Sequence, residues 1–102
     1  MSQRLIVRPE AESDIVSAAQ WYDEQRPGLS LEFRSALDQT LLAIKENPEL
    51  YARVYHDLRR ALLHRFPYGV FYVQRAEGVI VAAVLHTSRS AKPWRARLSG
   101  EN

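Results

Sequence analysis

Two stretches of helical periodicity, separated by a Pro-Gly pair, constrain the fold more than any other feature of the sequence. The first runs from Glu10 to about Gln25, and its core residues recur at helical spacing: Ile15, Ala18, Ala19 and Tyr22. The second repeats apolar residues at steps of four, four and three: Phe33, Leu37, Leu41 and Ile44. Pro27-Gly28 ends the first helix and Asn47-Pro48 ends the second. The pattern predicts a helical hairpin whose apolar stripes need cover from elsewhere in the chain.

That cover is expected from three β-prone runs in the second half of the chain, over residues 58–65, 69–75 and 79–86. A short strand over residues 4–7 is expected before the first helix. The run 79–86 is apolar on both faces and predicts an interior strand, whereas 58–65 carries Arg on both faces and predicts an edge or a working face. The sequence therefore predicts an α+β fold, in which the hairpin covers a sheet built around a three-stranded antiparallel meander.

Composition excludes several classes of site. The chain has no cysteine, which excludes disulfides, thiolate metal sites and a cysteine nucleophile. Its histidines, His56, His64 and His86, match neither zinc-finger nor metalloprotease spacing, so we expect no metal site. We find no Gly-rich phosphate loop and no G-x-S-x-G elbow, and we expect no cofactor.

Length and hydropathy predict one domain in the cytoplasm. A chain of 102 residues can bury one core, so we expect a single domain over residues 1–102 with a basic tail over 87–102. No stretch is apolar and long enough to cross a bilayer, and the start of the chain lacks the pattern of a signal peptide.

Charge is distributed unevenly along the chain. Residues 1–50 hold five basic and nine acidic side chains, whereas residues 51–102 hold nine basic and three acidic ones. Twelve of the fourteen basic residues are Arg, which binds phosphate and carboxylate groups through two parallel hydrogen bonds. The second half therefore has the electrostatics of a surface for an acidic partner.

The candidate partner-binding or catalytic residues lie on the meander and its tail: Arg59, Arg60, Arg65, Arg75, His86, Arg89, Lys92, Arg95 and Arg97. Strand alternation would place Arg59 and Arg65 on one face and Arg60 and His64 on the other. Such a surface could neutralise RNA phosphates or hold an acidic protein segment, or the charges could simply protect an edge strand. His86, three residues before Arg89, is a candidate general acid or base, or a side chain that caps the core.

Aromatic residues are interpreted as mostly structural. Helical spacing favours core packing for Trp21-Tyr22, and proximity to Pro48 favours loop packing for Tyr51 and Tyr55. Trp94 is expected to anchor the basic tail, which could begin a final helical turn at Lys92-Pro93.

The order of these elements resembles the RelE/ParE superfamily of toxins, and the ParE (plasmid-stabilisation) branch most closely. The resemblance covers about residues 4 to 97 and rests on residues in a shared order: Asp14-Ile15 leading to Trp21-Tyr22, Pro27-Gly28-Leu29 before Phe33, Pro48 closing the second helix, Arg59-Arg60, Phe66-Pro67-Tyr68 before Tyr72, and His86 with Arg89 and Trp94.

The resemblance implies a toxin held inactive by a cognate antitoxin, usually encoded beside it, whose extended segment wraps the hairpin and sheet. ParE-like members inhibit DNA gyrase and need no catalytic site. RelE-like members cut mRNA in the ribosome, with basic residues on phosphate and a Tyr or His as proton carrier. This chain has only Lys45 and Lys92 and no Tyr after Tyr72, so the lysine-rich site and C-terminal Tyr of the best-known RelE pattern are missing.

We therefore expect a gyrase-binding toxin whose target-binding residues are Arg59, Arg60, Arg65, His86 and Arg89. The alternative is a ribosome-dependent endoribonuclease in which arginines hold phosphate and His86 acts as general acid or base, because some RNA-cleaving relatives have a His at about this place. A third alternative is a non-toxic relative that only binds the antitoxin.

Overall fold

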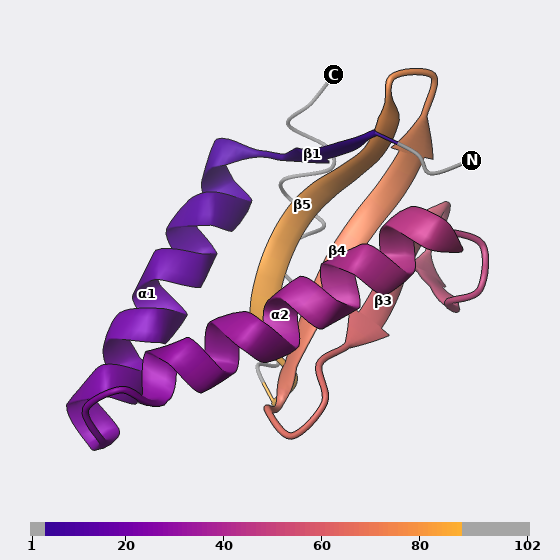
Figure 1. The fold of residues 1–102 in the computed structure, drawn as a ribbon. Helices are drawn as coiled ribbons and strands as arrows, with labels where there is room; N and C mark the ends of the chain where they lie inside the picture. Colours follow the sequence, from indigo (N-terminus) through magenta and orange to yellow (C-terminus); the bar gives the residue numbers. More distant parts are fainter. Residues whose placement is uncertain (1–3, 89–102) are drawn as a thin grey trace.

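The helical hairpin lies across one face of a five-stranded sheet in the computed structural model of the protein, which describes residues 4–88 (Figure 1). The elements are β1 (Leu5–Val7), α1 (Pro9–Gln25), α2 (Leu29–Glu46), β2 (Arg53–Tyr55), β3 (Leu58–Leu62), β4 (Tyr68–Arg75) and β5 (Gly78–His86). The strand order is β1-β5-β4-β3-β2. Among these strands β1 and β5 pair in parallel, and the other neighbours pair in antiparallel fashion. The predicted α+β class, hairpin and meander are confirmed.

The edge strand β2 is an element that the sequence analysis did not predict. It has three residues, and its pairing with β3 contains an irregularity between Arg53 and Tyr55. A strand this short shows no periodicity that distinguishes it from a loop. Its presence moves β3 from the expected edge to the second position, whereas β5 is an interior strand as its apolar run predicts.

The predicted strand 58–65 was too long. β3 ends at Leu62, and Leu63 to Pro67 form a turn in which Arg65 adopts a φ of 73°. Side chains no longer alternate between faces once the strand has ended. The predicted shared face of Arg59 and Arg65 therefore has no basis in strand geometry.

An aromatic cluster joins the hairpin to the sheet. Phe33 of α2 is fully buried, and its ring lies 5.3 Å from Tyr22 of α1, 5.6 Å from Phe66 and 5.3 Å from Tyr68 of β4. Tyr22 also contacts Phe66 edge-on at 5.0 Å. Tilted and edge-to-face ring pairs are favourable beyond the area they bury. These residues hold both helices and the β3–β4 turn together.

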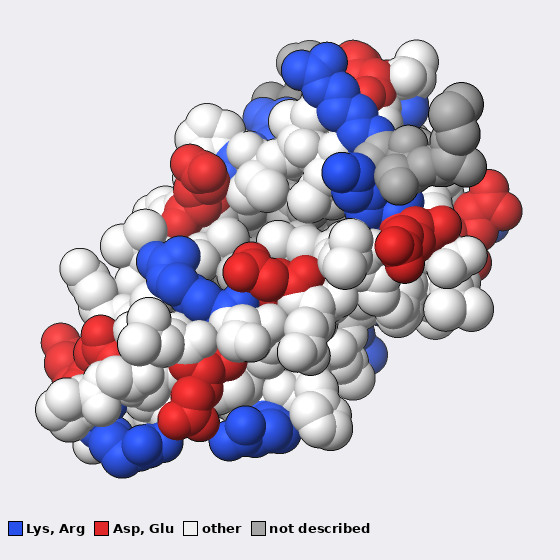
Figure 2. All heavy atoms as spheres, in the orientation of Figure 1, with Lys and Arg blue, Asp and Glu red and all other residues white. Residues whose placement is uncertain are grey.

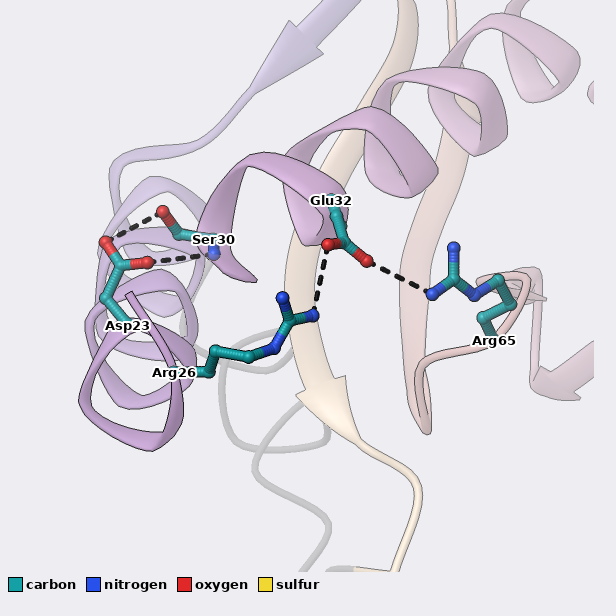
Figure 3. Close-up of polar contacts among 5 residues, drawn as sticks. All are labelled: Asp23, Arg26, Ser30, Glu32 and Arg65. Carbon is teal, nitrogen blue, oxygen red and sulfur yellow. Dashed lines mark hydrogen bonds and ion pairs between the residues drawn. The ribbon is translucent and has the colours of Figure 1, made fainter. Parts of the chain in front are cut away.

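The connection between the helices is stabilised from outside the second helix. α2 starts after Gly28, which has a φ of 88° and no side chain to cap the helix. Figure 3 shows that Asp23 of α1 supplies the cap, because its carboxylate accepts hydrogen bonds from the Ser30 backbone N–H at 2.9 Å and from the Ser30 hydroxyl at 2.8 Å. The backbone hydrogen bond, followed by the hydroxyl, holds the pKa of Asp23 below its usual value.

The connection from α2 to β2 is held by two side chains of the sheet. The Tyr72 hydroxyl donates a 2.6 Å hydrogen bond to the Pro48 carbonyl, and Arg59 donates to the carbonyls of Tyr51 at 2.6 Å and Glu49 at 3.2 Å. Tyr72 is fully buried, and burial raises its pKa to about 12, although the nearby Arg59 charge opposes the shift.

Replacing Tyr72 with Phe should lower the free energy of unfolding by about 1–3 kcal/mol, because the buried Pro48 carbonyl loses its donor. The deficit should depend on pH. The folded pKa of about 12 lies above the ordinary value of 10.0, so the contribution of Tyr72 is complete below pH 10 and is lost as pH rises towards about 12. Urea unfolding across this range should show the curves of wild type and Tyr72→Phe converging. A difference between them that does not change with pH would contradict this assignment.

Candidate functional site

His86 lies at the end of β5, on the helix-covered side of the sheet. It pairs with Tyr68 in the β4–β5 register, and the two rings meet edge-on at 5.3 Å. Its Nδ1 accepts a 3.1 Å hydrogen bond from the Ser88 backbone N–H and lies 2.7 Å from the Ser88 hydroxyl. Because Nδ1 is an acceptor, the neutral ring carries its hydrogen on Nε2.

A cleft of about 430 Å³ separates α1 from the end of β5, and we call it the α1/β5 cleft. Its described lining comes from α1 and from the two central strands: Asp14, Ser17, Ala18, Trp21, Tyr68, Val84, Leu85 and His86. Asp14 accepts a 3.0 Å hydrogen bond from the Val84 backbone N–H, so α1 contacts the edge of β5 at one end of the cleft. The volume falls within the range of ordinary ligand pockets.

Trp21 is a wall of this cleft, which corrects the interpretation of Trp21-Tyr22 as a core pair. Tyr22 is buried, but Trp21 is 52% exposed. Adjacent helical residues point about 100° apart, so only one of the two can face the core. That geometric rule, applied to the sequence, would have identified Trp21 as a surface residue.

Arg59 makes hydrogen bonds that stabilise the fold. It pairs with Tyr72 across the β3–β4 register, on the face that packs against the helices, and its guanidinium group donates to the carbonyls of Glu49 and Tyr51. These hydrogen bonds occupy part of its donor capacity and tie β3 to the connection between α2 and β2.

Arg60 lies on the opposite face of the sheet. It pairs with Phe71, which belongs to a second apolar cluster made of Leu58, Phe71, Val73, Ala83 and Leu85. Its aliphatic carbons lie over Gly69, where an added Cβ would be 3.1 Å from Arg60 Cγ. Arg60 is exposed, and its guanidinium group has no hydrogen-bond or ion-pair partner within residues 4–88.

Arg65 belongs to an ion-paired group at the other end of α2. Figure 3 shows Glu32 between Arg26 and Arg65, with both N–O distances at 3.1 Å. Hydrogen bonds from Arg26 and then Arg65 keep the pKa of Glu32 below its usual value. The three side chains tie the β3–β4 turn to the start of α2, while that of Arg65 is still 62% exposed.

The candidates within the described residues therefore do not form one basic platform. Arg59 contacts the segment that follows α2, Arg65 is ion-paired to Glu32 in the first turn of α2, and Arg60 lies on the other face of the sheet. Figure 2 shows basic and acidic side chains interspersed on the helical side of the molecule. Arg89, and with it Lys92, Trp94, Arg95 and Arg97, lies outside the described residues.

No group of three His, Asp or Glu residues between 4 and 88 is arranged to hold a metal ion. No helix in the same range is both long and apolar enough to cross a membrane.

The comparisons with known proteins identify the family. Residues 5–91 match the family described as "ParE toxin of type II toxin-antitoxin system, parDE". The chain belongs to the ParE toxin family. A solved structure titled "Chromosomal ParDE TA system from P. aeruginosa" superposes with a TM-score of 0.76 over 85% of this chain and 98% of that chain, at 12% sequence identity. At that identity the likeness shows the fold alone. No curated protein sequence matched the chain.

Several residues behind the sequence resemblance to ParE toxins are core residues. Tyr22, Phe33, Phe66 and Tyr68 form the aromatic cluster, and Tyr72 holds the α2–β2 connection. These residues specify how the hairpin packs on the sheet. The pattern therefore carries more information about the fold than about the target.

Proposed function

We propose that this ParE family member arrests growth in the cytoplasm by binding DNA gyrase, and that a cognate antitoxin neutralises it in a hetero-oligomeric complex. The observation that carries the proposal is the ParE family match over residues 5–91. Gyrase inhibition is what the resemblance to the ParE branch implies, and it requires no assembled catalytic group.

The arrangement of the candidate residues also favours binding over RNA cleavage. In an endoribonuclease, cations must stand beside the general acid or base to stabilise the added charge on phosphate. Within residues 4–88, the charged side chain that lines the cleft with His86 is the carboxylate of Asp14. Arg65 contacts Phe66 and Glu32 instead, at the other side of the aromatic cluster.

The proposed target-binding residues are Arg59, Arg60, Arg65, His86 and Arg89. A partner that contacts every described member of this set would have to reach both faces of the sheet. Substitution of Arg60 is the most direct test of this set, because the Arg60 guanidinium group is exposed and unpaired within the described range. Its substitution leaves the hydrogen bonds of Arg59 and the ion pairs of Arg65 in place.

The purified chain should abolish ATP-dependent supercoiling of relaxed plasmid by DNA gyrase. Arg60→Ala should need an approximately tenfold higher concentration for half-inhibition, equivalent to about 1.4 kcal/mol of binding free energy. Arg34→Ala is the matched control, because Arg34 is an exposed arginine on α2 outside the candidate set.

Full supercoiling in an excess of the chain would refute gyrase as the target. New cuts in translated mRNA, lost in His86→Ala and detected by primer extension, would establish the ribosome-dependent endoribonuclease instead. Induced expression without growth arrest in a host with a susceptible target would indicate a non-toxic relative that only binds antitoxin.

A further inference from the structure

The second apolar cluster lies on the face of the sheet that points away from the helices. Phe71 of β4 alternates with Val70 and Tyr72, which belong to the helix-covered core. The partly buried neighbours of the cluster also come from strands: Val54, Tyr55 and Ile80. Both α1 and α2 pack against the other face (Figure 1). Within residues 4–88, the cluster is therefore a single layer of strand side chains.

The side chains of this single layer are nevertheless buried. Leu58 and Ala83 have no exposed area, and Phe71 is 7% exposed. Side chains stand roughly perpendicular to a sheet, so neighbouring strands shield their flanks and leave their outer ends in water. Leu62 shows this state on the same face, where it lies beside Gly69 and is 56% exposed. The cluster therefore has a cover that Leu62 lacks.

The cover belongs to the chain itself, because these side chains are buried without any partner molecule. Two segments lie outside the described residues, 1–3 and 89–102. Residues 1–3 contain one apolar side chain and reach at most about 10 Å when extended. Residues 89–102 begin four residues after Leu85, a member of the cluster, and reach about 46 Å when extended. The strand β5 spans about 30 Å, so the C-terminal segment is long enough to cross the whole cluster.

We propose that residues 89–102 cover the second apolar cluster and that the Trp94 indole packs over Phe71. Phe71 pairs with Ala83, two residues before Leu85 in β5. Trp94 lies nine residues after Leu85, which gives the segment the length to fold back over this pair. An indole buries about 150–250 Å², enough to cover a phenyl ring. The inference is separate from the proposed function, since it holds whichever target the protein binds.

In this arrangement, basic side chains lie on the face that carries Arg60. The segment holds four basic residues and one acidic residue: Arg89, Lys92, Arg95, Arg97 and Glu101. With the indole turned towards the sheet, the charged groups beside it remain in water, because burying an unpaired charge is costly. The basic surface predicted from the second half of the chain then lies on the face of Arg60, away from Arg65 and its partner Glu32.

The two tryptophans of the chain allow Trp94 to be observed separately. In Trp21→Phe the fluorescence comes from Trp94, and in Trp94→Phe it comes from Trp21, which is 52% exposed. The Trp94 indole should emit at a shorter wavelength than Trp21 and should be quenched less by acrylamide, because the cluster shields it from water. Emission and quenching of Trp94 like those of free tryptophan would refute the inference.

A single cysteine can report access to the cluster, because the chain has none of its own. Ala83→Cys places a thiol in the cluster, and Ala61→Cys places one in the helix-covered core; both alanines have no exposed area. Adding Trp94→Ala to Ala83→Cys should accelerate maleimide labelling of the thiol by roughly tenfold or more, since the local cover is lost. Adding Trp21→Ala instead is the matched control and should leave the labelling rate unchanged.

The Ala61→Cys variant separates a local cover from a general loss of stability. Its labelling should not respond to Trp94→Ala, because Ala61 belongs to the core that the helices cover. Equal labelling rates of Ala83→Cys with and without Trp94 would overturn the inference, as would equal acceleration at both positions. Neither result bears on gyrase inhibition or on antitoxin binding.

Discussion

Phe33→Ala should lower the free energy of unfolding by about 3–5 kcal/mol, the cost of removing a buried phenyl ring and leaving a cavity. Phe33 is fully buried and contacts the rings of Tyr22, Phe66 and Tyr68. A domain of this size has about 5–15 kcal/mol of stability in total. The variant should therefore be close to unfolding at physiological temperature, as urea unfolding monitored by circular dichroism would show.

The cost should be specific to the aromatic cluster. Leu42→Ala removes an exposed side chain from the same helix and should change stability by less than about 0.5 kcal/mol. A Phe33→Ala loss below about 2 kcal/mol would mean that the surrounding rings collapse into the space, and that the cluster is not what joins the hairpin to the sheet.

The sequence predicted an element correctly where apolar residues recur at the spacing of that element and pack against the core. Phe33, Leu37 and Ile44 predicted the buried stripe of α2, and the apolar run 79–86 predicted an interior strand. Both signals are local, because each residue's spacing reflects the geometry of its own element. β2 lacked this signal because three residues are too few for a period.

The candidate site was less predictable because its contacts are not local. Arginines adjacent in sequence, such as Arg59 and Arg60, lie on opposite faces, and Arg65 pairs with Glu32 from 33 residues earlier. Asp14 meets Val84 across 70 residues. Clustering of charge along a chain therefore does not predict clustering in space, because strand alternation separates neighbours and turns redirect them.

Gly78 is also constrained by a contact that is distant in the sequence, because it lies against Arg4, the residue before β1. Gly78 starts β5 with a φ of 135°, a conformation that side-chain-bearing residues rarely adopt. An added Cβ would overlap the Arg4 carbonyl oxygen, the atom that accepts a 2.8 Å hydrogen bond from the Val79 N–H. β1 would have to move away from β5 to make room.

Gly78→Ala should therefore lower the free energy of unfolding by about 3 kcal/mol or more, from backbone strain and the displacement of β1 together. Gly28→Ala is the matched control, since Gly28 also has a positive φ, of 88°, but nothing lies within 4 Å of its added Cβ. Strain alone should cost that variant about 1–2 kcal/mol. In Gly78→Ala the Val79 amide should also exchange faster, because it loses the Arg4 acceptor, whereas in Gly28→Ala it should not. Equal losses of stability in the two variants would show that β1 adjusts freely and that its pairing with β5 contributes little.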